Sequence, residues 1–218
     1  MTGKQAIIRL KVKINQLDTS SNRTVRPELA LLFINDAYKK LAKAKYVRAT
    51  SREDFSGFQL NQVTTDELNH LTTSYEAAPN HEGDEYNIPT SDIEDYWIHL
   101  RSEIQVKVGN KTAWIKNPNY RTLDTLGPAT GDPFNESDPS EPIIFFEDNK
   151  IKVLANNFEI PSHRIIYYRK PNEITLDDEI EVPFMNEIID MAAFAMLENW
   201  GDPRSQSKIS VDKVMENE

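Results

Sequence analysis

The sequence predicts an α+β fold: an N-terminal helical hairpin and a C-terminal helix packed with a small antiparallel β-sheet region. Near both ends of the 218-residue chain, in residues 7–44 and 184–196, apolar residues recur at three- and four-residue spacing. Between these segments the spacing changes to two, in short runs of Ile, Val, Phe and Tyr separated by turn residues. A chain of this length is long enough to bury a core.

Two helices are expected at the N-terminus, as an antiparallel pair between residues 4 and 46. The apolar face of the first, with lysines opposite, consists of Ile7, Leu10, Ile14 and Leu17. Pro27 suits the first turn of the second helix. Its apolar stripe consists of Ala30, Phe33, Ile34, Ala37, Leu41 and Ala44. We expect this stripe to belong to the subunit's own core more than to contacts with neighbours.

Two shorter helices are expected further along, because two capping boxes occur there, each a Ser or Thr followed three residues later by glutamate. The first box starts at Thr64 and predicts a helix to about residue 75. The second starts at Ser91 and predicts a helix to about residue 100. The polar and acidic residues 76–87 between them are expected to form a surface loop.

The β-rich region follows. A hairpin is expected over residues 104–116, with its turn at Gly109. The sequence IIFFEDNKIKVL predicts a second hairpin around its Asp-Asn turn, and RIIYYRK supplies a further strand. Between the hairpins, residues 117–142 are rich in proline and acidic residues. A loop this long in a compact domain is usually functional or interfacial.

The C-terminal helix is expected over residues 183–200, within VPFMNEIIDMAAFAMLENWGDPR. It carries two apolar faces, one with Phe184, Ile188, Met191 and Ala195, the other with Ile189, Ala193 and Met196. Such a helix is expected to be covered on both sides.

The domain organisation follows from these elements. We expect a single domain over residues 1–218, with a helical part at 4–100 and 183–200 and a β-rich part at 102–171. The tail at 204–218 is polar.

The composition excludes several classes of function. The formal net charge of −10 argues against nucleic-acid binding by counterion release. The chain has no cysteine, which excludes disulfides, thiolate metal sites and a cysteine nucleophile. The first residues are too charged for a signal peptide, and the longest apolar run is far too short to span a membrane.

No arrangement typical of catalysis stands out. The four histidines lack the helical spacing of a metal site, and neither a phosphate-cradling loop nor a nucleophile elbow occurs. The acidic stretch 81–85 and the oxygen donors of residues 132–138 are more typical of solvated turns than of calcium loops. The sequence therefore predicts a protein that is not an enzyme and has no catalytic, cofactor-binding or metal site.

Several blocks, in order, resemble head-to-tail ring proteins of crAss-like and related short-tailed phages. RPELALLFINDAYKKLAKAKY resembles the family's N-terminal helix, with Asn35, Asp36 and Ala37 as its core. FSGFQLNQVTTDELNHL is similar to the connector that follows, and GDPFNESDPSEPIIFFEDNKIKVL to a DPF segment leading into a hairpin. IIYYRKPNEI is similar to the next strand, and PFMNEIIDMAAFAMLENWGDPR to the terminal helix with its trailing Arg204.

The resemblance implies a non-enzymatic virion structural protein. Such proteins form homo-oligomeric rings, usually dodecamers, that dock under the portal protein and connect the capsid to the tail. The expected partners are the portal and neighbouring tail or ring proteins, with DNA passing through the lumen without specific binding and no membrane. The expected location is the virion's head-to-tail connector, assembled in the host cytoplasm. Repulsion between acidic residues and phosphate would fit a conduit for DNA ejection.

Two alternatives remain: an acidic protein-interaction or regulatory module, and a metal-dependent hydrolase using the acidic loops. In the ring interpretation, Asp132, Pro133 and Phe134 are candidates for contact with an adjacent ring, although Phe134 packed into its own sheet is an equal alternative. The remaining candidates for inter-subunit or inter-ring contact are Ile189, Ala193, Met196, Trp200 and Arg204.

Overall fold

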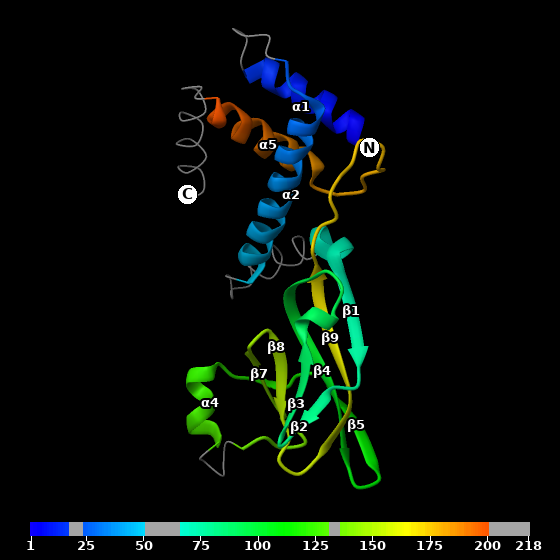
Figure 1. Cartoon of the computed structure of the whole chain (residues 1–218), viewed down its shortest axis with the longest axis vertical. Helices are drawn as coiled ribbons and strands as arrows, with labels where there is room; N and C mark the ends of the chain where they lie inside the picture. The colour runs from blue at the N-terminus through cyan, green and yellow to red at the C-terminus, as the bar shows by residue number, and fades with distance from the viewer. Residues whose placement is uncertain (18–23, 51–65, 131–135, 201–218) are drawn as a thin grey trace. The chain divides into compact units, whose positions relative to one another are not determined.

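The computed structural model describes residues 1–17, 24–50, 66–130 and 136–200. The chain divides into two compact units, one formed by residues 1–70 and 171–218 and the other by residues 71–170. We call them the helical unit and the β unit. The α+β class predicted from the sequence is confirmed: the N-terminal helices pack with the C-terminal helix, and the strands form two sheets (Figure 1).

Three helices make up most of the helical unit: α1 (Gly3–Leu17), α2 (Pro27–Thr50) and α5 (Met185–Asn199). All three were predicted. Helix α5 packs against both α1 and α2, so the N-terminal pair is completed by a helix from the other end of the chain (Figure 1). On α2, Ala30, Ile34 and Ala37 are buried as expected, whereas Leu41 is half-buried and Ala44 is exposed.

This packing buries almost all of the two apolar faces of α5. The buried residues of the helix are Met185, Ile188, Ile189, Ala192, Ala193, Met196 and Leu197. Small side chains among them allow the neighbouring helices to approach closely. Met191, predicted on one of the apolar faces, stays 36% exposed.

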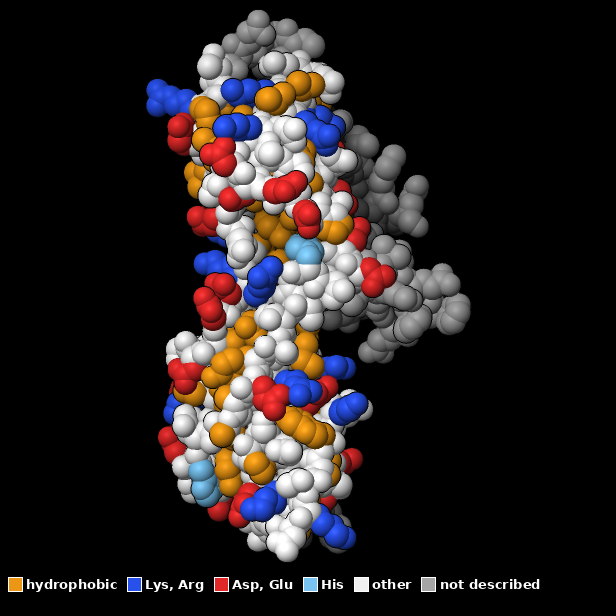
Figure 2. Space-filling model, turned by 90° about the vertical axis from the view of Figure 1, so that its right-hand side faces the viewer, with side chains coloured by type: hydrophobic (Ala, Val, Ile, Leu, Met, Phe, Trp, Pro, Cys, Tyr) orange, Lys and Arg blue, Asp and Glu red, His pale blue; other side chains and the backbone are white. Residues whose placement is uncertain are grey.

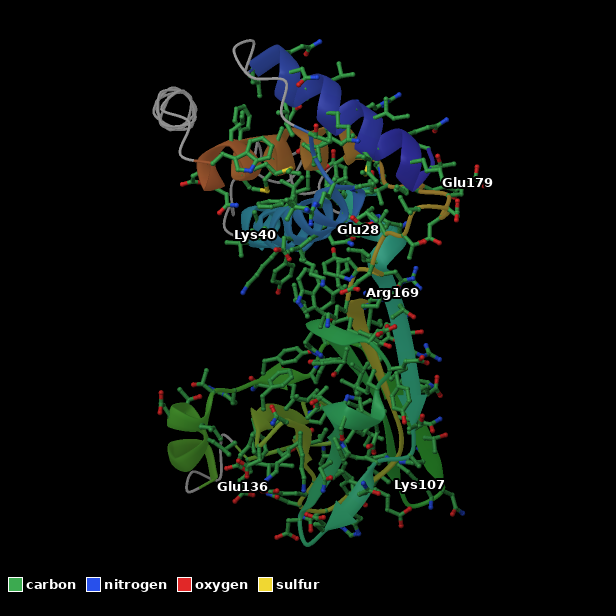
Figure 3. All side chains as sticks on the ribbon, turned by 45° about the horizontal axis from the view of Figure 1, so that its top comes forward. Glu28, Lys40, Lys107, Glu136, Arg169 and Glu179 are labelled. Carbon is green, nitrogen blue, oxygen red and sulfur yellow. The ribbon has the colours of Figure 1, made fainter. Side chains whose placement is uncertain are left out.

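The N-terminus is held by the segment that precedes α5. The Gly3 amide donates to the Asp178 carbonyl (3.2 Å) and the Lys4 amide to the Leu176 carbonyl (3.0 Å). Thr2 and Glu179 form an antiparallel bridge, and Figure 3 shows Glu179 beside the first turn of α1. These bonds satisfy amides at the start of α1 that have no partner within the helix.

The first sheet of the β unit has the order β1-β9-β4-β5 and is antiparallel throughout. Its strands are β1 (Thr72–Ala77), β4 (Tyr96–Val108), β5 (Lys111–Ile115) and β9 (Glu159–Arg169). The chain enters the unit through β1 and leaves it through β9. Thr72 pairs with Tyr168, so these two ends of the unit lie side by side.

The second sheet has the order β2-β3-β8-β7-β6, and only the β6–β7 pair is parallel. Its strands are β2 (Asn80–Glu82), β3 (Glu85–Pro89), β6 (Asn119–Tyr120), β7 (Ile143–Glu147) and β8 (Lys150–Leu154). The predicted hairpins are confirmed. Asp148 (φ 50°) and Asn149 (φ 58°) both take positive φ in the β7–β8 turn, as a two-residue hairpin turn requires.

The two sheets face one another across a shared core. It joins apolar residues of β4 and β9, such as Ile104 and Ile165, to residues of the second sheet, such as Ile144 and Val153. The opposite face of the second sheet has a smaller cluster of Ile143, Phe145 and Leu154, against which Leu126 of α4 (Leu123–Thr130) packs.

Both shorter predicted helices are wrong over most of their length. Residues 66–71 are helical, ending in the 3-10 turn η1 (Asn69–Leu71), but the predicted helix to residue 75 gives way to β1 at Thr72. The second is only the 3-10 turn η2 (Thr90–Asp92) before β4. Runs of β-branched and aromatic residues with cross-strand partners override the capping boxes. Thr64, at the first box, lies outside the described residues.

The expected loops also contain regular structure. Residues 76–87, predicted as a surface loop, form the end of β1, the strand β2 and much of β3. The part of residues 117–142 that the structure describes contains β6 and α4. The boundary between helical and β-rich parts consequently lies near residue 71 instead of residue 100.

Candidate functional site

A serine and a histidine pair in the centre of the β unit. Ser102 of β4 lies 2.9 Å from His163 of β9, measured from Oγ to Nε2. Both side chains are 0% exposed. This pair was not predicted from the sequence, because the two residues lie far apart in the chain and become neighbours only through the β4–β9 pairing.

Tyr120 connects this pair to a second histidine, His99, which is more exposed. The Ser102 amide donates to the Tyr120 hydroxyl at 2.5 Å, and His99 Nε2 lies 3.4 Å from the same hydroxyl. The His99 ring makes edge contacts with Tyr120 and Phe146, at centroid distances of 5.8 and 5.0 Å. Tyr120 and Phe146 are 43% and 42% exposed, so this aromatic cluster borders solvent.

Burial keeps both histidines neutral. Desolvation lowers the pKa of His163 to about 3, with a further contribution from nearby His99, and lowers the pKa of His99 to about 4. Nδ1 of each ring has no hydrogen-bond partner among the described residues. A catalytic Ser–His pair needs a group that orients the base and a path for substrate to the hydroxyl. With Ser102 fully buried, the pair is suited to a structural role in this conformation.

An acidic hollow lies at one end of the second sheet. Two adjoining cavities of about 510 and 640 Å³ share Glu136, Ser137 and Asn156. The carboxylates around them are Glu82, Asp84, Glu85, Glu136, Asp138 and Glu141. Figure 3 labels Glu136 below α4. The Ser140 hydroxyl and amide both donate to Asp138, and these hydrogen bonds lower the pKa of its carboxyl.

The acidic stretch 81–85, expected to be a solvated turn, forms the tight β2–β3 hairpin with its turn at residues 83–84, and of residues 132–138 only 136–138 are described. His81 stacks on Tyr86 with ring centroids 4.4 Å apart, and Gly83 (φ 66°) makes the β2–β3 turn. Lys152 binds Glu85 (3.1 Å) and Glu147 (2.5 Å), which neutralises part of the local charge. Over the described ranges, no group of three or more His, Asp or Glu side chains is placed to hold a metal ion.

Three of the predicted contact residues lie in the core of the helical unit. Ile189, Ala193 and Met196 are 4%, 0% and 0% exposed within the helical unit, so they offer no surface to a neighbour in this conformation. Helix periodicity showed that they share an apolar face but not that α1 and α2 would cover it. Trp200 is half-buried, and its amide donates to Met196 at the end of α5.

The remaining predicted contacts cannot be placed. Asp132, Pro133, Phe134 and Arg204 lie outside the described residues.

Helix α1 carries an exposed apolar surface that was not predicted from the sequence. Ile8 and Val12 lie one turn apart and are 61% and 50% exposed, opposite the buried face of the helix. Lys11 stands between them in sequence and is half-buried. The sequence does contain a sign of this surface, because the apolar residues at positions 8 and 12 lie outside the apolar stripe of residues 7, 10, 14 and 17. Figure 2 shows Lys or Arg and hydrophobic side chains side by side on the helical unit.

Comparison with known proteins assigns no family. No protein-family model matches the chain, and no curated protein matches it either. Among the described helices, none is long and apolar enough to cross a membrane.

Proposed function

We propose that this chain is a structural subunit of a ring in the head-to-tail connector of a short-tailed phage, between portal and tail. The ordered blocks that resemble this family support the proposal, as does the α+β fold with an intimate pairing of N- and C-terminal helices. In this role the protein acts through its surfaces and performs no chemistry.

The observation that carries the proposal is the exposed apolar strip on α1. Its helix already buries one side in the subunit core, yet it keeps Ile8 and Val12 on the other side. Apolar residues on both sides of a helix favour a second packing surface. A heterologous ring needs such a surface on each subunit, in addition to the core.

The chain's charge is consistent with a passive conduit. A net charge of −10 gives DNA little to bind through phosphate contacts, so DNA would pass through the lumen without being retained. DNA is therefore proposed as cargo, and the portal and the adjacent ring or tail proteins as stable partners.

Assembly state tests the proposal. The purified chain, alone and mixed with the portal protein of the same phage, would be measured by native mass spectrometry and negative-stain electron microscopy. A closed ring of twelve 25.1 kDa chains has a mass of about 300 kDa. A chain that stays monomeric alone and with portal would overturn the proposal.

A second candidate, an acidic module that occupies a partner's basic surface, is favoured by the hollow around Glu82, Asp84 and Glu136. The two candidates differ in stoichiometry. The module would bind its partner as a monomer, with an affinity that falls in the variant Glu82→Gln/Glu136→Gln, whereas the same variant should leave ring mass unchanged.

A further inference from the structure

Helices α1 and α5 have opposite charge. Each has 15 residues. Helix α1 contains Lys4, Arg9, Lys11 and Lys13 and no acidic residue. Helix α5 contains Glu187, Asp190 and Glu198 and no basic residue. In a chain with a net charge of −10, α1 is therefore a locally basic element.

Part of this complementarity is used inside the subunit. Lys13 binds Asp190 at 2.8 Å and Arg9 donates to Asn186 at 3.2 Å, both across the α1–α5 contact. The two helices therefore already fit one another in charge along one side of each.

The outer face of α5 resembles the outer face of α1, but its charged residues are negative instead of positive. Glu187, Met191 and Glu198 are spaced by four and seven residues, which places them on one side of the helix. Met191 is 36% exposed, and the Glu187 and Glu198 side chains are exposed near it. The α1 outer face has exposed Ile8 and Val12 beside Lys11. Glu187 also forms an ion pair with Lys45 of α2 (2.9 Å), so the α5 face offers a neighbour mainly the charge of Glu198 beside Met191, and the α1 face that of Lys11 beside Ile8 and Val12.

We propose that the outer face of α1 on one subunit docks on the outer face of α5 on the next copy of the chain. Charge decides between the possible pairings. Two α1 faces would place lysines against lysines, and two α5 faces would place glutamates against glutamates, and both arrangements are repulsive. The α1–α5 pairing brings opposite charges together around Ile8, Val12 and Met191.

A second copy of this chain is also a better partner for these faces than an unrelated protein. Copies with a net charge of −10 repel one another unless a basic element of one meets an acidic surface of the next. A contact between two different faces is heterologous, so it generates a closed ring when the rotation closes. The inference rests on the proposed ring and names its subunit interface.

Cysteine cross-linking tests the contact, because the native chain contains no cysteine. Two full-length variants, Ile8→Cys and Met191→Cys, would carry tags of different mass. They would be mixed under assembling conditions, oxidised and separated without reductant. Each variant oxidised alone provides the matched control, and circular dichroism checks that both are folded.

The expected result is a disulfide between the two tags in the mixture, at least tenfold more abundant than either homodimer. Rings that form without this cross-link, or equal cross-linking in all three samples, would overturn the α1–α5 contact and leave the proposed ring intact. A mixture that never assembles, with or without portal, would overturn both.

A charge exchange gives an independent measurement. Lys11→Glu and Glu198→Lys should each raise the protein concentration needed for half assembly about tenfold, while an equimolar mixture should recover part of that loss. A mixture no better than the single variants would contradict the pairing. Lys111→Glu on β5, outside both faces, serves as the control.

Discussion

At the residue scale, Gly3 stands where the structure leaves no room for a side chain. A Cβ atom added there would lie 1.9 Å from the Thr175 carbonyl oxygen, and the contact is with backbone that cannot turn aside. The same segment accepts hydrogen bonds from the Gly3 and Lys4 amides. The absence of a side chain therefore lets the N-terminus lie against residues 174–180.

We expect Gly3→Ala to destabilise the helical unit by about 1–3 kcal/mol, because the chain must move apart to admit the methyl group. Urea denaturation followed by far-UV circular dichroism measures the change. Gln16→Ala, an exposed substitution on the same helix, is the control and should be close to neutral. Equal stability of the two variants would show that this close approach is not required.

The buried histidines should make the β unit acid-sensitive. Their pKa values in the folded chain, about 3 for His163 and about 4 for His99, lie below the ordinary value of 6.5. Unfolded histidines therefore take up protons first, so this contribution to stability is complete above pH 6.5 and is lost as the pH falls toward 4 and then 3.

We expect His163→Gln to flatten the fall in unfolding free energy between pH 6.5 and 4.5, because glutamine does not titrate. Urea titrations at several pH values measure this slope. His81→Gln, at an exposed position, retains the buried histidine and should keep the native slope. Parallel curves for the native chain and His163→Gln would contradict the assignment. Glu76 and Glu159, whose pKa values are lowered by Arg164 and Lys107, act only at lower pH.

At the scale of elements, turn chemistry fixes the β7–β8 hairpin. Asp148 and Asn149 adopt the left-handed conformation, and the Asn149 carbonyl also accepts bonds from the Thr90 amide and hydroxyl, each at 2.8 Å. The turn thus holds its own strands and the end of β3 together.

Asn149→Ala should cost about 1 kcal/mol, because alanine tolerates positive φ less well than asparagine, whereas Asn149→Gly should be neutral or stabilising. Both variants keep the carbonyl that Thr90 uses. Thermal unfolding of the three proteins measures the order of stability, and Asn149→Ala as stable as Asn149→Gly would contradict this account of the turn.

The elements that sequence predicted well are those whose local signals agree with their long-range partners. Helix α5 has both helical spacing and two apolar faces to bury, and the Asp148-Asn149 turn is flanked by two alternating strands. The helix expected after Ser91 failed because β9 supplies hydrogen bonds and apolar contacts to residues 96–99, and the β9 partners of these residues lie more than sixty positions away in sequence. Pairing between strands so far apart in the sequence gives little signal in the local pattern of residues.

The candidate surfaces were less predictable, for a similar reason. An apolar residue on a helix belongs to a core or an interface according to what covers it. Ile189 and Ile8 have the same chemistry, but α5 is covered by two helices and the outer face of α1 is not covered by a described element. Periodicity identifies such faces but does not assign their neighbours.

At the scale of the whole molecule, the β unit is an insertion between the two halves of the helical unit. Its core joins residues of both sheets without needing a residue from the helices. We expect residues 71–170 produced alone to fold, with dispersed amide resonances in NMR spectra. A matched fragment lacking β1, residues 78–170, should lose this dispersion because β9 then has an uncovered edge. Collapse of both fragments would show that the unit depends on the helices.

Assembly through oppositely charged faces should depend on salt. Raising the ionic strength from about 0.05 M to about 0.5 M shortens the screening length severalfold, which weakens exposed ion pairs. Sedimentation velocity should then show a larger share of free subunits. A ring that is equally stable at both ionic strengths would indicate that apolar contacts dominate the interface.

The pairing of Thr72 with Tyr168 has a mechanical consequence. The polypeptide leaves the β unit next to the point where it enters, so a pull between the chain's two ends is borne first by the contacts of α5 with α1 and α2. The β unit is then a side branch that carries no tension while those helices stay packed. Only when α5 and the preceding residues 174–180, which are hydrogen-bonded to the N-terminus and to Asn35 of α2, have separated would force reach β1 and β9, and it would open them from their paired ends, one hydrogen bond at a time.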